Sequence, residues 1–501
     1  MARKATARKA TLRYDRGTLV LHPPPQGQTW VRFVTWDDRI EKFRMPALRY
    51  RAFMEAMRAE GTTVVDEVGG FGAVRLEPRS PRPPFPHQQE ALTAWTKAGR
   101  RGIVVLPTGA GKTYLAQLAM EATPRTTLVV VPTLDLMHQW YAELTTTFPD
   151  VEVGLLGGGS KDSSPVLVAT YDSAAIFAEQ LGNRYGLVVF DECHHLPSDF
   201  KRSIAEYSVA PYRLGLSATP DRADGREDDL VDLIGPLVYH KTPDQLSGHA
   251  LAEHKIVRID VALNDDERRR YDALVAERNT FLRDNNIFLG TLAGWQRFVG
   301  ASARSKAGRA AMLAHREARA IAFGTEGKLR VLGDLLARHQ HDRVLIFTDN
   351  NATVYRVSHD LLVPAITHQT KVKERHETLD KFRSGDYPRL VTSRVLNEGV
   401  DVPDANVAIV LSGTRSTREY VQRLGRILRK QEGKLALLYE VVALGTSEEK
   451  VSEQRRGDGD RWGSKRGGLR SSLDEPAEDK PAPKTDVAPI AAQDTLDFED
   501  L

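Results

Sequence analysis

A short run rich in glycine carries the most specific chemistry in the sequence. It follows an apolar segment, precedes a helical pattern, and reads Leu106, Pro107, Thr108, Gly109, Ala110, Gly111, Lys112 and Thr113. Glycines let successive backbone N–H groups surround a phosphate, and a helix start adds the positive end of its dipole. Lys112 would place a charge on the β- and γ-phosphates, and the Thr113 hydroxyl would bind Mg²⁺. The run therefore predicts a nucleotide-phosphate site, although Leu106 stands where the strict pattern has a glycine.

Two carboxylates follow the apolar segment Leu187–Phe190. Asp191, at the end of that strand, is expected to face the phosphate loop and to hold the hard cation. Glu192 would orient or deprotonate an attacking water. Ligation of a metal by His194 and His195 is disfavoured, because neighbouring side chains point apart and no further ligands surround them.

Three further groups would complete a nucleotide-hydrolysing site. A tripeptide at the end of another apolar segment would bond to the segment around His194 and couple hydrolysis to movement: Ser217, Ala218 and Thr219. Arg426 and Arg429, three apart on one helical face after Gln422, would meet the γ-phosphate from another part of the chain. The amide of Gln88 would read an adenine edge. Together these residues predict ATP and Mg²⁺ as cofactors.

The amino-acid composition limits the classes of partner and the compartment that the chain suits. The chain has 501 residues and a formal net charge of +3. Nine acidic residues and two lysines lie between Ser471 and Leu501, so this tail carries −7 and residues 1–470 carry +10. A basic body with an acidic tail favours a polyanion partner over a membrane surface. The lack of a long apolar run excludes a membrane span, and a single cysteine, Cys193, favours a reducing cytoplasm.

The N-terminal part has the pattern of a small α+β domain. Apolar residues on both sides of Asp15–Gly17 predict a hairpin over residues 11–22. A strand is expected at Trp30–Phe33, and a helix at Met45–Glu60, where apolar residues recur at helical spacing. The proline-rich segment Arg79–Pro84 is typical of a linker.

Short apolar runs separated by helical patterns predict two further α/β domains in tandem, each with a parallel sheet whose strands are buried on both faces. The runs of the first domain are Gly102–Leu106, Thr127–Val131, Val166–Thr170, Leu187–Phe190 and Leu214–Leu216. Those of the second are Val344–Phe347, Ala365–Thr367, Leu390–Thr392, Val407–Leu411 and Leu435–Tyr439. Between them, residues 264–322 are charged and helical, with Arg304, Arg309 and Arg316 among apolar residues, which predicts an inserted helical subdomain.

A polynucleotide track is expected where strands of both α/β domains end. Hydroxyls and glycine N–H groups at such ends bind phosphates without reading bases. The candidates are Pro132, Thr133, Gly157, Gly158, Thr170 and Tyr171 in the first domain, and Thr348, Thr370 and Thr392 in the second. Basic side chains of the helical insertion would close around the strand.

The ordered set of these segments resembles the superfamily-two helicases over about residues 80–445. Long phrases resemble the XPB group of DNA helicases and translocases: Arg101–Thr113, Asp191–Pro197, Pro364–His368, Asn397–Asn406 and Glu419–Arg429. The resemblance implies two RecA-like parallel-sheet motor domains, an N-terminal damage-recognition-like domain and a thumb-like helical insertion. The implied boundaries are 1–80 for the N-terminal domain and linker, 81–245 for the ATP-binding domain, 246–322 for the thumb, 323–450 for the C-terminal helicase domain and 451–501 for a disordered acidic tail.

The resemblance also implies an activity and further site residues. Gly399 and Asp401 would join the nucleotide site. The family carries an Arg-Glu-Asp triplet, implicated in duplex opening, shortly after Ser-Ala-Thr. Here that register reads Arg222-Ala223-Asp224, and a full triplet follows at Arg226–Asp228, so which of the two acts is open. The implied function is an ATP-dependent 3′–5′ DNA helicase or duplex translocase that opens DNA in nucleotide excision repair, in the cytoplasm and on the nucleoid.

Other functions and partners stay open from the sequence. The alternatives are another superfamily-two motor, either a restriction-type translocase or an RNA helicase, and an ATP-gated DNA-binding clamp that recruits partners. The intact Lys112, Asp191 and Glu192 argue against the clamp. A separate nuclease would make any incision, because no nuclease motif is visible. Gln493–Phe498 in the tail resembles peptides that dock on bacterial sliding clamps.

Overall fold

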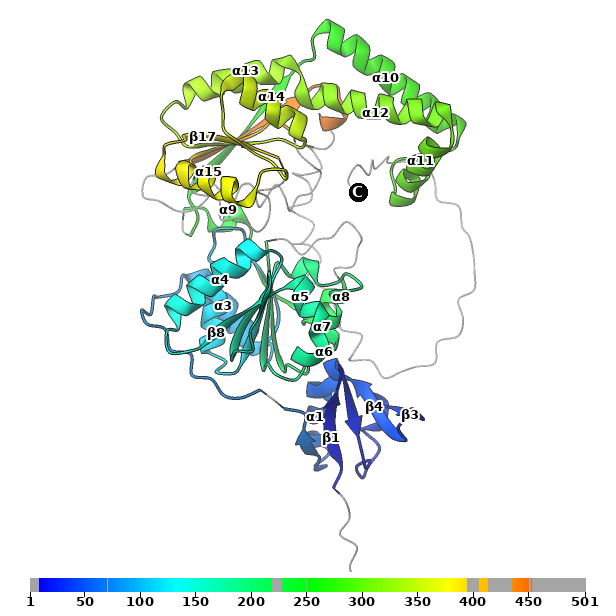
Figure 1. Cartoon of the computed structure of the whole chain (residues 1–501), viewed down its shortest axis with the longest axis vertical. Coiled ribbons are helices and arrows are strands. Elements are labelled where there is room, and N and C mark those ends of the chain that lie inside the picture. The colour runs from blue at the N-terminus through cyan, green and yellow to red at the C-terminus, as the bar shows by residue number, and fades with distance from the viewer. Residues whose placement is uncertain are drawn as a thin grey trace, which may run out of the picture. The chain divides into compact units, whose positions relative to one another are not determined.

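The computed structural model describes residues 9–69, 71–218, 228–248, 250–393, 405–412, 435–449 and 452 (Figure 1). The described residues up to Leu246 form one compact unit, and those from Ser247 onward form a second. The predicted tail, 451–501, lies outside the described residues except for Ser452.

A five-stranded sheet and one helix form the N-terminal domain. The sheet order is β3-β4-β2-β1-β5, and the elements are β1 Thr11–Asp15, β2 Thr18–Leu21, β3 Thr35–Asp37, β4 Lys42–Pro46, α1 Tyr50–Ala59 and β5 Val65–Glu67. The predicted hairpin is confirmed, because β1 and β2 pair antiparallel through the turn residues Arg16 and Gly17, both with positive φ. The turn needs glycine for a second reason, since the Tyr207 ring occupies the space of a side chain at Gly17.

Two predictions in this domain are wrong in detail. Residues expected to form a strand at Trp30–Phe33 instead include a 3₁₀ helix, η1 Val31–Phe33. Local bonds satisfy this segment, since the Trp30 indole donates to the Gly27 carbonyl at 3.0 Å and Phe33 N–H donates to the Trp30 carbonyl. The helix predicted from Met45 begins only at Tyr50, because Met45 belongs to β4 and pairs with Leu19 of β2.

The N-terminal domain is held to the following domain by side chains that reach backbone carbonyls. The Tyr14 hydroxyl lies 2.8 Å from the Glu179 carbonyl, and Arg51 donates to the carbonyls of Gly99 and Pro211. Val209 completes the apolar core of the N-terminal domain. Such contacts place both domains in one unit.

An eight-stranded sheet forms the centre of the first α/β domain. Its order is β13-β6-β12-β11-β7-β10-β8-β9, with bounds β6 Arg101–Val105, β7 Thr127–Val131, β8 Val153–Gly157, β9 Ser160–Lys161, β10 Val166–Thr170, β11 Leu187–Asp191, β12 Tyr212–Ser217 and β13 Leu237–His240. All pairs are parallel except β8 with β9. The five predicted strands are confirmed, while β8, β9 and β13 are additional, less uniformly buried strands.

Helices cover both faces of this sheet. They are α2 Pro86–Lys97, α3 Lys112–Glu121, α4 Leu134–Thr147, α5 Tyr171–Ile176, α6 Ala178–Leu181, α7 Ser203–Glu206, α8 Asp229–Leu233 and α9 Pro243–Leu246, with the 3₁₀ helix η3 Cys193–His195. Figure 1 shows α3 and α4 on one face and α5, α6 and α7 on the other. This layering buries both faces of the strands, as their unbroken apolar runs predict.

The second unit holds a six-stranded parallel sheet of order β14-β19-β18-β15-β17-β16. Its strands are β14 Glu253–Val261, β15 Val344–Phe347, β16 Ala365–Ile366, β17 Arg389–Thr392, β18 Val407–Val410 and β19 Leu435–Ala443, and its helices are α13 Glu326–Arg338, α14 Asn351–Leu361 and α15 Val372–Ser384. The fold class, α/β with two parallel sheets in tandem, is confirmed. One segment differs from the prediction, since residues 253–261 of the expected insertion form β14, which pairs with β19. Its residues are exposed or half-exposed except Val261, so it lacks the apolar run used to recognise the other strands.

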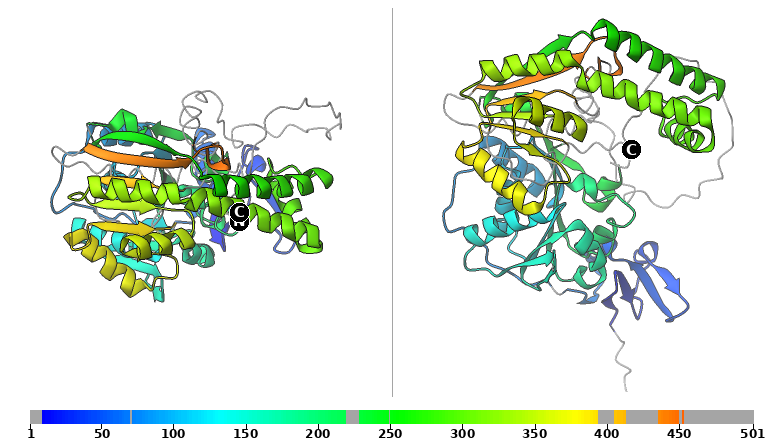
Figure 2. Two further views of the ribbon diagram at one scale, coloured as in Figure 1. Left: turned by 90° about the horizontal axis from the view of Figure 1, so that it is seen from above. Right: turned by 45° about the horizontal axis from the view of Figure 1, so that its top comes forward.

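Three helices form the insertion before α13. They are α10 Asp265–Asp284, α11 Leu292–Arg304 and α12 Lys306–Gly324. Both views of Figure 2 show α10 and α12 side by side. Trp295 of α11 packs edge-on against Phe298 and near His315, so its indole contributes to the apolar core of this insertion. Among the described helices, none combines the length and the apolar content needed to cross a bilayer.

A buried ion pair makes a stability prediction for the second unit. Lys328 donates to Glu448 and to the Leu411 carbonyl, and both charged side chains are about 1% exposed. Replacing Lys328 by Met leaves the Glu448 carboxylate buried without its cation, so we expect a loss of about 3–5 kcal/mol. Urea unfolding of the full chain measures it. Lys373→Met, which removes an exposed pair with Glu377 at 3.9 Å, should change stability by about 0.5 kcal/mol or less; equal losses in the two variants would contradict the prediction.

Candidate functional site

The glycine-rich run forms a loop between β6 and α3, as predicted. Gly111 caps α3 with a left-handed backbone, φ 79°, and Gly109 also has positive φ. A Cβ at Gly111 would lie 2.3 Å from the Gln88 amide nitrogen. Glycine at this position therefore answers two constraints, backbone conformation and lack of space. Lys112 and Thr113 begin the helix, where a bound phosphate would meet free N–H groups.

Gln88 lies beside this loop and is almost fully buried. Its amide N–H group lies 3.3 Å from the Ala110 carbonyl and 3.2 Å from the Gly111 carbonyl, while its oxygen accepts from Phe85 N–H. The neighbouring His87 also contacts the Ala110 carbonyl, at 2.8 Å. The predicted contact of Gln88 with an adenine edge stays a prediction. The amide nitrogen braces the phosphate loop, and the amide oxygen caps the start of α2.

Lys112 and Glu192 meet in the structure. The Lys112 ammonium lies 3.5 Å from a Glu192 carboxylate oxygen and 3.3 Å from the Leu106 carbonyl, and both side chains are largely buried. Glu192 has a left-handed backbone, φ 47°, which is uncommon for a residue with a side chain. The turn after β11 thus directs this carboxylate toward the phosphate loop.

Asp191 ends β11 as a buried carboxylate. One oxygen accepts the indole N–H of Trp140 at 2.8 Å, and the other accepts the backbone N–H of Glu192 at 3.1 Å. Burial, and next the charge of Glu192, raise the pKa of Asp191 to about 6. Two largely buried carboxylates therefore lie next to each other at this edge. A divalent cation would stabilise both carboxylates. Mg²⁺ prefers oxygen ligands, and the Asp191 carboxylate and the Thr113 hydroxyl are groups of that kind.

His194 connects this site to the next strand. Its Nδ1 lies 3.2 Å from the Ser217 hydroxyl and 3.5 Å from Glu192. Ser217 ends β12, which lies between β6 and β11 in the sheet. The structure thus brings together Lys112, Asp191, Glu192, His194 and Ser217, with the buried Ala218 directly after β12.

Several predicted track residues also gather at one edge of the first sheet. β10 pairs with β7 and β8, so the ends of these three strands are neighbours. They carry Pro132, Thr133, Gly157, Gly158 and Thr170. Gly157 packs so close to Met137 and Thr170 that a Cβ would stand about 3 Å from both. This edge is compatible with backbone contacts to phosphates.

Four of the predicted track residues place their side chains elsewhere. The Tyr171 ring is fully buried, and its hydroxyl donates to the Asp191 carbonyl at 3.0 Å. Thr170 caps α5 by accepting from Ser173 N–H. The hydroxyls of Thr348 and Thr392 are buried and bond to Ser412 and to the Ser393 carbonyl. These side chains stabilise strand ends, so a phosphate contact at these positions would use backbone groups, and the predicted contacts stay predictions. Thr370, half-buried, accepts from Thr367 N–H.

A third group of predicted residues lies outside the described part of the chain. It comprises Thr219, Arg222, Asp224, the first two residues of the triplet Arg226–Asp228, Gly399, Asp401, Gln422, Arg426 and Arg429.

The sequence did not single out Trp140 or Trp36. Trp140 shares a helical face with the buried Met137 and Leu144, so its spacing indicates only core packing. Nothing in that pattern signals that its N–H reaches Asp191. Trp36 is 51% exposed on the edge strand β3, and a lone tryptophan in a short strand carries no sequence signal of exposure.

A glycine substitution tests the phosphate loop. Gly111→Ala puts a Cβ on a left-handed residue and into the space of the buried Gln88 amide. We expect nucleotide affinity to fall at least tenfold, measured by fluorescence of a labelled ADP. Gly333→Ala in α13 is the control, because its Cβ meets no neighbour within 4 Å. Equal affinities for the two variants would contradict the assigned role of this loop.

Comparisons with known protein families divide the chain in the same order as its motifs. Residues 12–68 match the xeroderma pigmentosum group B helicase damage recognition domain. Residues 82–222 match the res subunit of type III restriction enzymes, and residues 327–431 match the helicase conserved C-terminal domain.

Curated relatives extend this similarity along most of the chain. It is 39% identical over 451 residues to the DNA 3′–5′ translocase XPB2 of Sulfurisphaera tokodaii, covering 89% of this chain and 99% of that protein. It is 31% identical to the DNA 3′–5′ helicases XPB of Mycobacterium tuberculosis and Kineococcus radiotolerans, covering 72% and 74% of this chain but only 60% and 62% of theirs. With its two RecA-like α/β domains, the chain belongs to the XPB family of superfamily-two helicases.

Proposed function

We propose that the chain is an ATP-dependent DNA 3′–5′ helicase or duplex translocase that opens DNA in nucleotide excision repair. The supporting observation is a pairing of two facts. The chain matches a named 3′–5′ translocase over nearly its whole length, and it holds Lys112, Asp191 and Glu192 at one sheet edge. An intact hydrolytic edge favours a motor over a passive recruitment clamp.

Each residue of the edge has a distinct proposed role. Lys112 and the loop Thr108–Gly111 would bind the β- and γ-phosphates of ATP. Asp191 and Thr113 would hold Mg²⁺, which when bound neutralises phosphate charge. Glu192 would accept the proton of the attacking water. Arg426 and Arg429, with Gly399 and Asp401, would complete the site from the second motor domain.

The contact between Lys112 and Glu192 would hold the proposed base inactive until a nucleotide binds. At 3.5 Å, the ammonium and the carboxylate compensate one another inside a largely buried site. A phosphate that draws Lys112 toward itself would release Glu192 to bind water. His194, 3.5 Å from the same carboxylate and bonded to Ser217, would pass this change to the end of β12.

Replacing Glu192 by Gln tests the base. The amide keeps the size of the side chain but cannot take a proton, so steady-state ATP hydrolysis should fall about 100-fold or more while ATP and DNA stay bound together. Phosphate release and a DNA-binding assay with ATP measure the two effects. Glu121→Gln, at the exposed end of α3, is the control. Turnover equal to that of the control would remove Glu192 from the mechanism.

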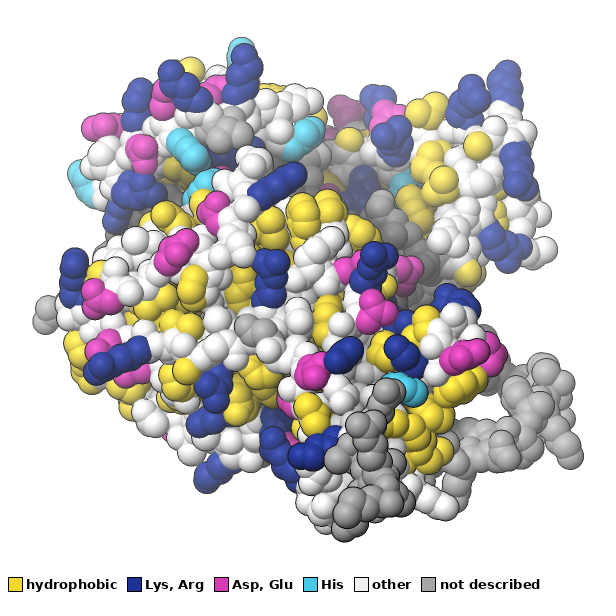
Figure 3. All heavy atoms as spheres, turned by 60° about the horizontal axis from the view of Figure 1, so that its bottom comes forward, with side chains coloured by type: hydrophobic (Ala, Val, Ile, Leu, Met, Phe, Trp, Pro, Cys, Tyr) yellow, Lys and Arg dark blue, Asp and Glu magenta, His cyan; other side chains and the backbone are white. Residues whose placement is uncertain are grey.

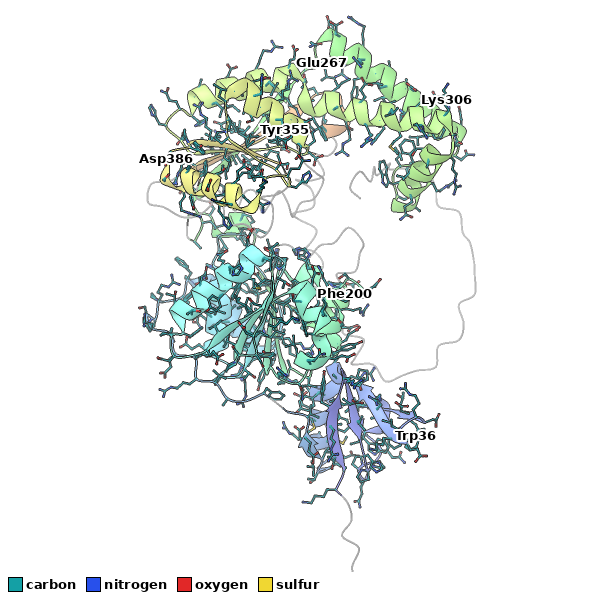
Figure 4. All side chains as sticks on the ribbon, in the orientation of Figure 1. Trp36, Phe200, Glu267, Lys306, Tyr355 and Asp386 are labelled. Atoms are coloured by element: carbon teal, nitrogen blue, oxygen red, sulfur yellow. The ribbon has the colours of Figure 1, made fainter. Side chains whose placement is uncertain are left out.

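The DNA track is proposed along both motor domains and the helical insertion. Pro132, Thr133, Gly157 and Gly158 offer backbone and hydroxyl groups at one edge. In the insertion, exposed cations form no ion pair with other described residues: Arg297, Arg304, Lys306, Arg309 and Arg316. Lys306 points outward at the start of α12 (Figure 4). On the face drawn in Figure 3, by contrast, Lys and Arg side chains are mixed with acidic ones.

Trp36 is a second proposed DNA contact, in the N-terminal domain. Its indole is half exposed at the outer edge of the sheet (Figure 4) and rests edge-on against Phe43 at 5.0 Å. An exposed aromatic ring that is held in place by a neighbouring ring is suited to stack on an unpaired nucleobase. This position would let the damage-recognition-like domain sense opened or distorted duplex.

Trp36→Ala should weaken binding to bubble DNA by about 1–3 kcal/mol. Stacking involves no counterions, so the slope of log Kd against log salt should stay that of the unchanged chain. Fluorescence anisotropy over a salt series measures both quantities. Phe200→Ala removes an aromatic ring of similar exposure from the same unit and serves as the control. A steeper or shallower salt slope without loss of affinity would contradict stacking.

Remaining alternatives and partners are separable by experiment. A restriction-type translocase would track duplex DNA without displacing a strand, and an RNA helicase would be stimulated by RNA over DNA. ATPase and strand-displacement assays on duplex, forked and bubble DNA against RNA therefore decide among the motors. We further propose a cytoplasmic, nucleoid-associated location, a separate nuclease partner, and docking of Gln493–Phe498 on a sliding clamp. Pull-down with and without residues 493–498 tests the last of these.

A further inference from the structure

Two buried aromatic side chains hold Asp191 from opposite sides of the sheet. Trp140, on α4, donates its indole N–H to a carboxylate oxygen at 2.8 Å. Tyr171, the first residue of α5, donates its hydroxyl to the Asp191 backbone carbonyl at 3.0 Å. Both rings are at most 1% exposed. Figure 1 shows α4 and α5 on opposite faces of the sheet, so the two contacts fix both the side chain and the backbone of Asp191.

Both helices start at the proposed DNA edge. α4 follows Thr133, whose hydroxyl accepts from Leu136 N–H, and α5 follows Thr170, whose hydroxyl accepts from Ser173 N–H. Thr133 and Thr170 stand at the ends of neighbouring strands, β7 and β10. A shift of either helix start therefore moves a ring that touches Asp191. Tyr171 directly follows Thr170, and Trp140 lies two turns into the helix that follows Thr133, so short connections join the proposed DNA edge to the carboxylate.

We propose that Trp140 and Tyr171 are positioning residues that link DNA bound at this edge to the metal-holding carboxylate of Asp191. Trp140 occupies one carboxylate oxygen and leaves the other oriented by Glu192 N–H. Tyr171 anchors the peptide unit that precedes Glu192, so it also influences the direction of the Glu192 carboxylate. The inference rests on the proposed function, because it assumes that DNA contacts the ends of β7 and β10.

The same domain contains a buried tryptophan and a buried tyrosine that make the same kinds of hydrogen bond away from the nucleotide edge, and these serve as controls. Trp95, about 1% exposed, donates its indole N–H to the Arg213 carbonyl at 2.9 Å. Tyr185, about 3% exposed, donates its hydroxyl to the Ser164 carbonyl at 3.2 Å. Neither touches the nucleotide edge. Substitution by Phe at these positions removes the same donor from the same kind of environment.

The experiment compares four full-length variants: Trp140→Phe, Tyr171→Phe, Trp95→Phe and Tyr185→Phe. The first measurement is the Kd for forked DNA with and without a non-hydrolysable ATP analogue and Mg²⁺, since the ratio of the two reports the coupling between the sites. The second is the Mg²⁺ concentration at half-saturation of labelled ADP binding. Thermal unfolding of each variant accompanies both.

We expect the ratio of DNA affinities to move toward one in Trp140→Phe and Tyr171→Phe, and to keep its original value in the two controls. Trp140→Phe should in addition raise the half-saturating Mg²⁺ concentration about tenfold or more, as loss of an outer hydrogen bond to a metal ligand does. Should one variant fail to fold, the other still carries the comparison with its control.

Three results would overturn the proposal. One is an unchanged ratio in both site variants, and another is an equal change in the controls, which would indicate general destabilisation. The third is a Mg²⁺ midpoint for Trp140→Phe equal to that for Trp95→Phe. A starting chain whose ATP hydrolysis ignores DNA would instead count against the proposed function, while the Mg²⁺ midpoint would still decide the contact between Trp140 and Asp191.

Discussion

The order of three parallel strands makes this site possible. β12 lies between β6 and β11, and all three run in the same direction. Because the carboxyl ends of parallel strands meet at one edge of a sheet, the loops after these strands are forced together. The lysine after β6, the two carboxylates at the end of β11 and the serine that ends β12 thereby become neighbours, although they are distant in sequence.

The adjacency sets the electrostatics of the edge. Two consecutive, largely buried carboxylates, Asp191 and Glu192, lie beside the Lys112 ammonium group. Burial first, and then repulsion from the neighbouring Glu192, raise the pKa of Asp191. A divalent metal ion bound with the nucleotide would offset this repulsion between the two carboxylates.

Sequence patterns predicted the parts of the site that depend on backbone periodicity. Unbroken apolar runs located the five buried strands around the loop, and glycine spacing located the loop itself. Sequence patterns did not predict which hydrogen-bond partners individual polar side chains have in the core. Gln88 bonds to the phosphate loop, and the Tyr171 hydroxyl bonds to Asp191, since each polar atom in a core must find a partner nearby. Hydroxyls of threonines at strand ends turn inward for the same reason. Such choices depend on distances between segments, which one-dimensional spacing does not contain.

Cys193, the single cysteine of the chain, stands between Glu192 and His194 with its thiol fully buried. Burial, and next the charge of Glu192, raise the pKa of this thiol far above its ordinary value. The thiolate is the form that attacks peroxide, so this thiol, packed in the apolar core of the domain, is unreactive toward such oxidants. Burial therefore shields the residue between Glu192 and His194 from the oxidants that create lesions in DNA.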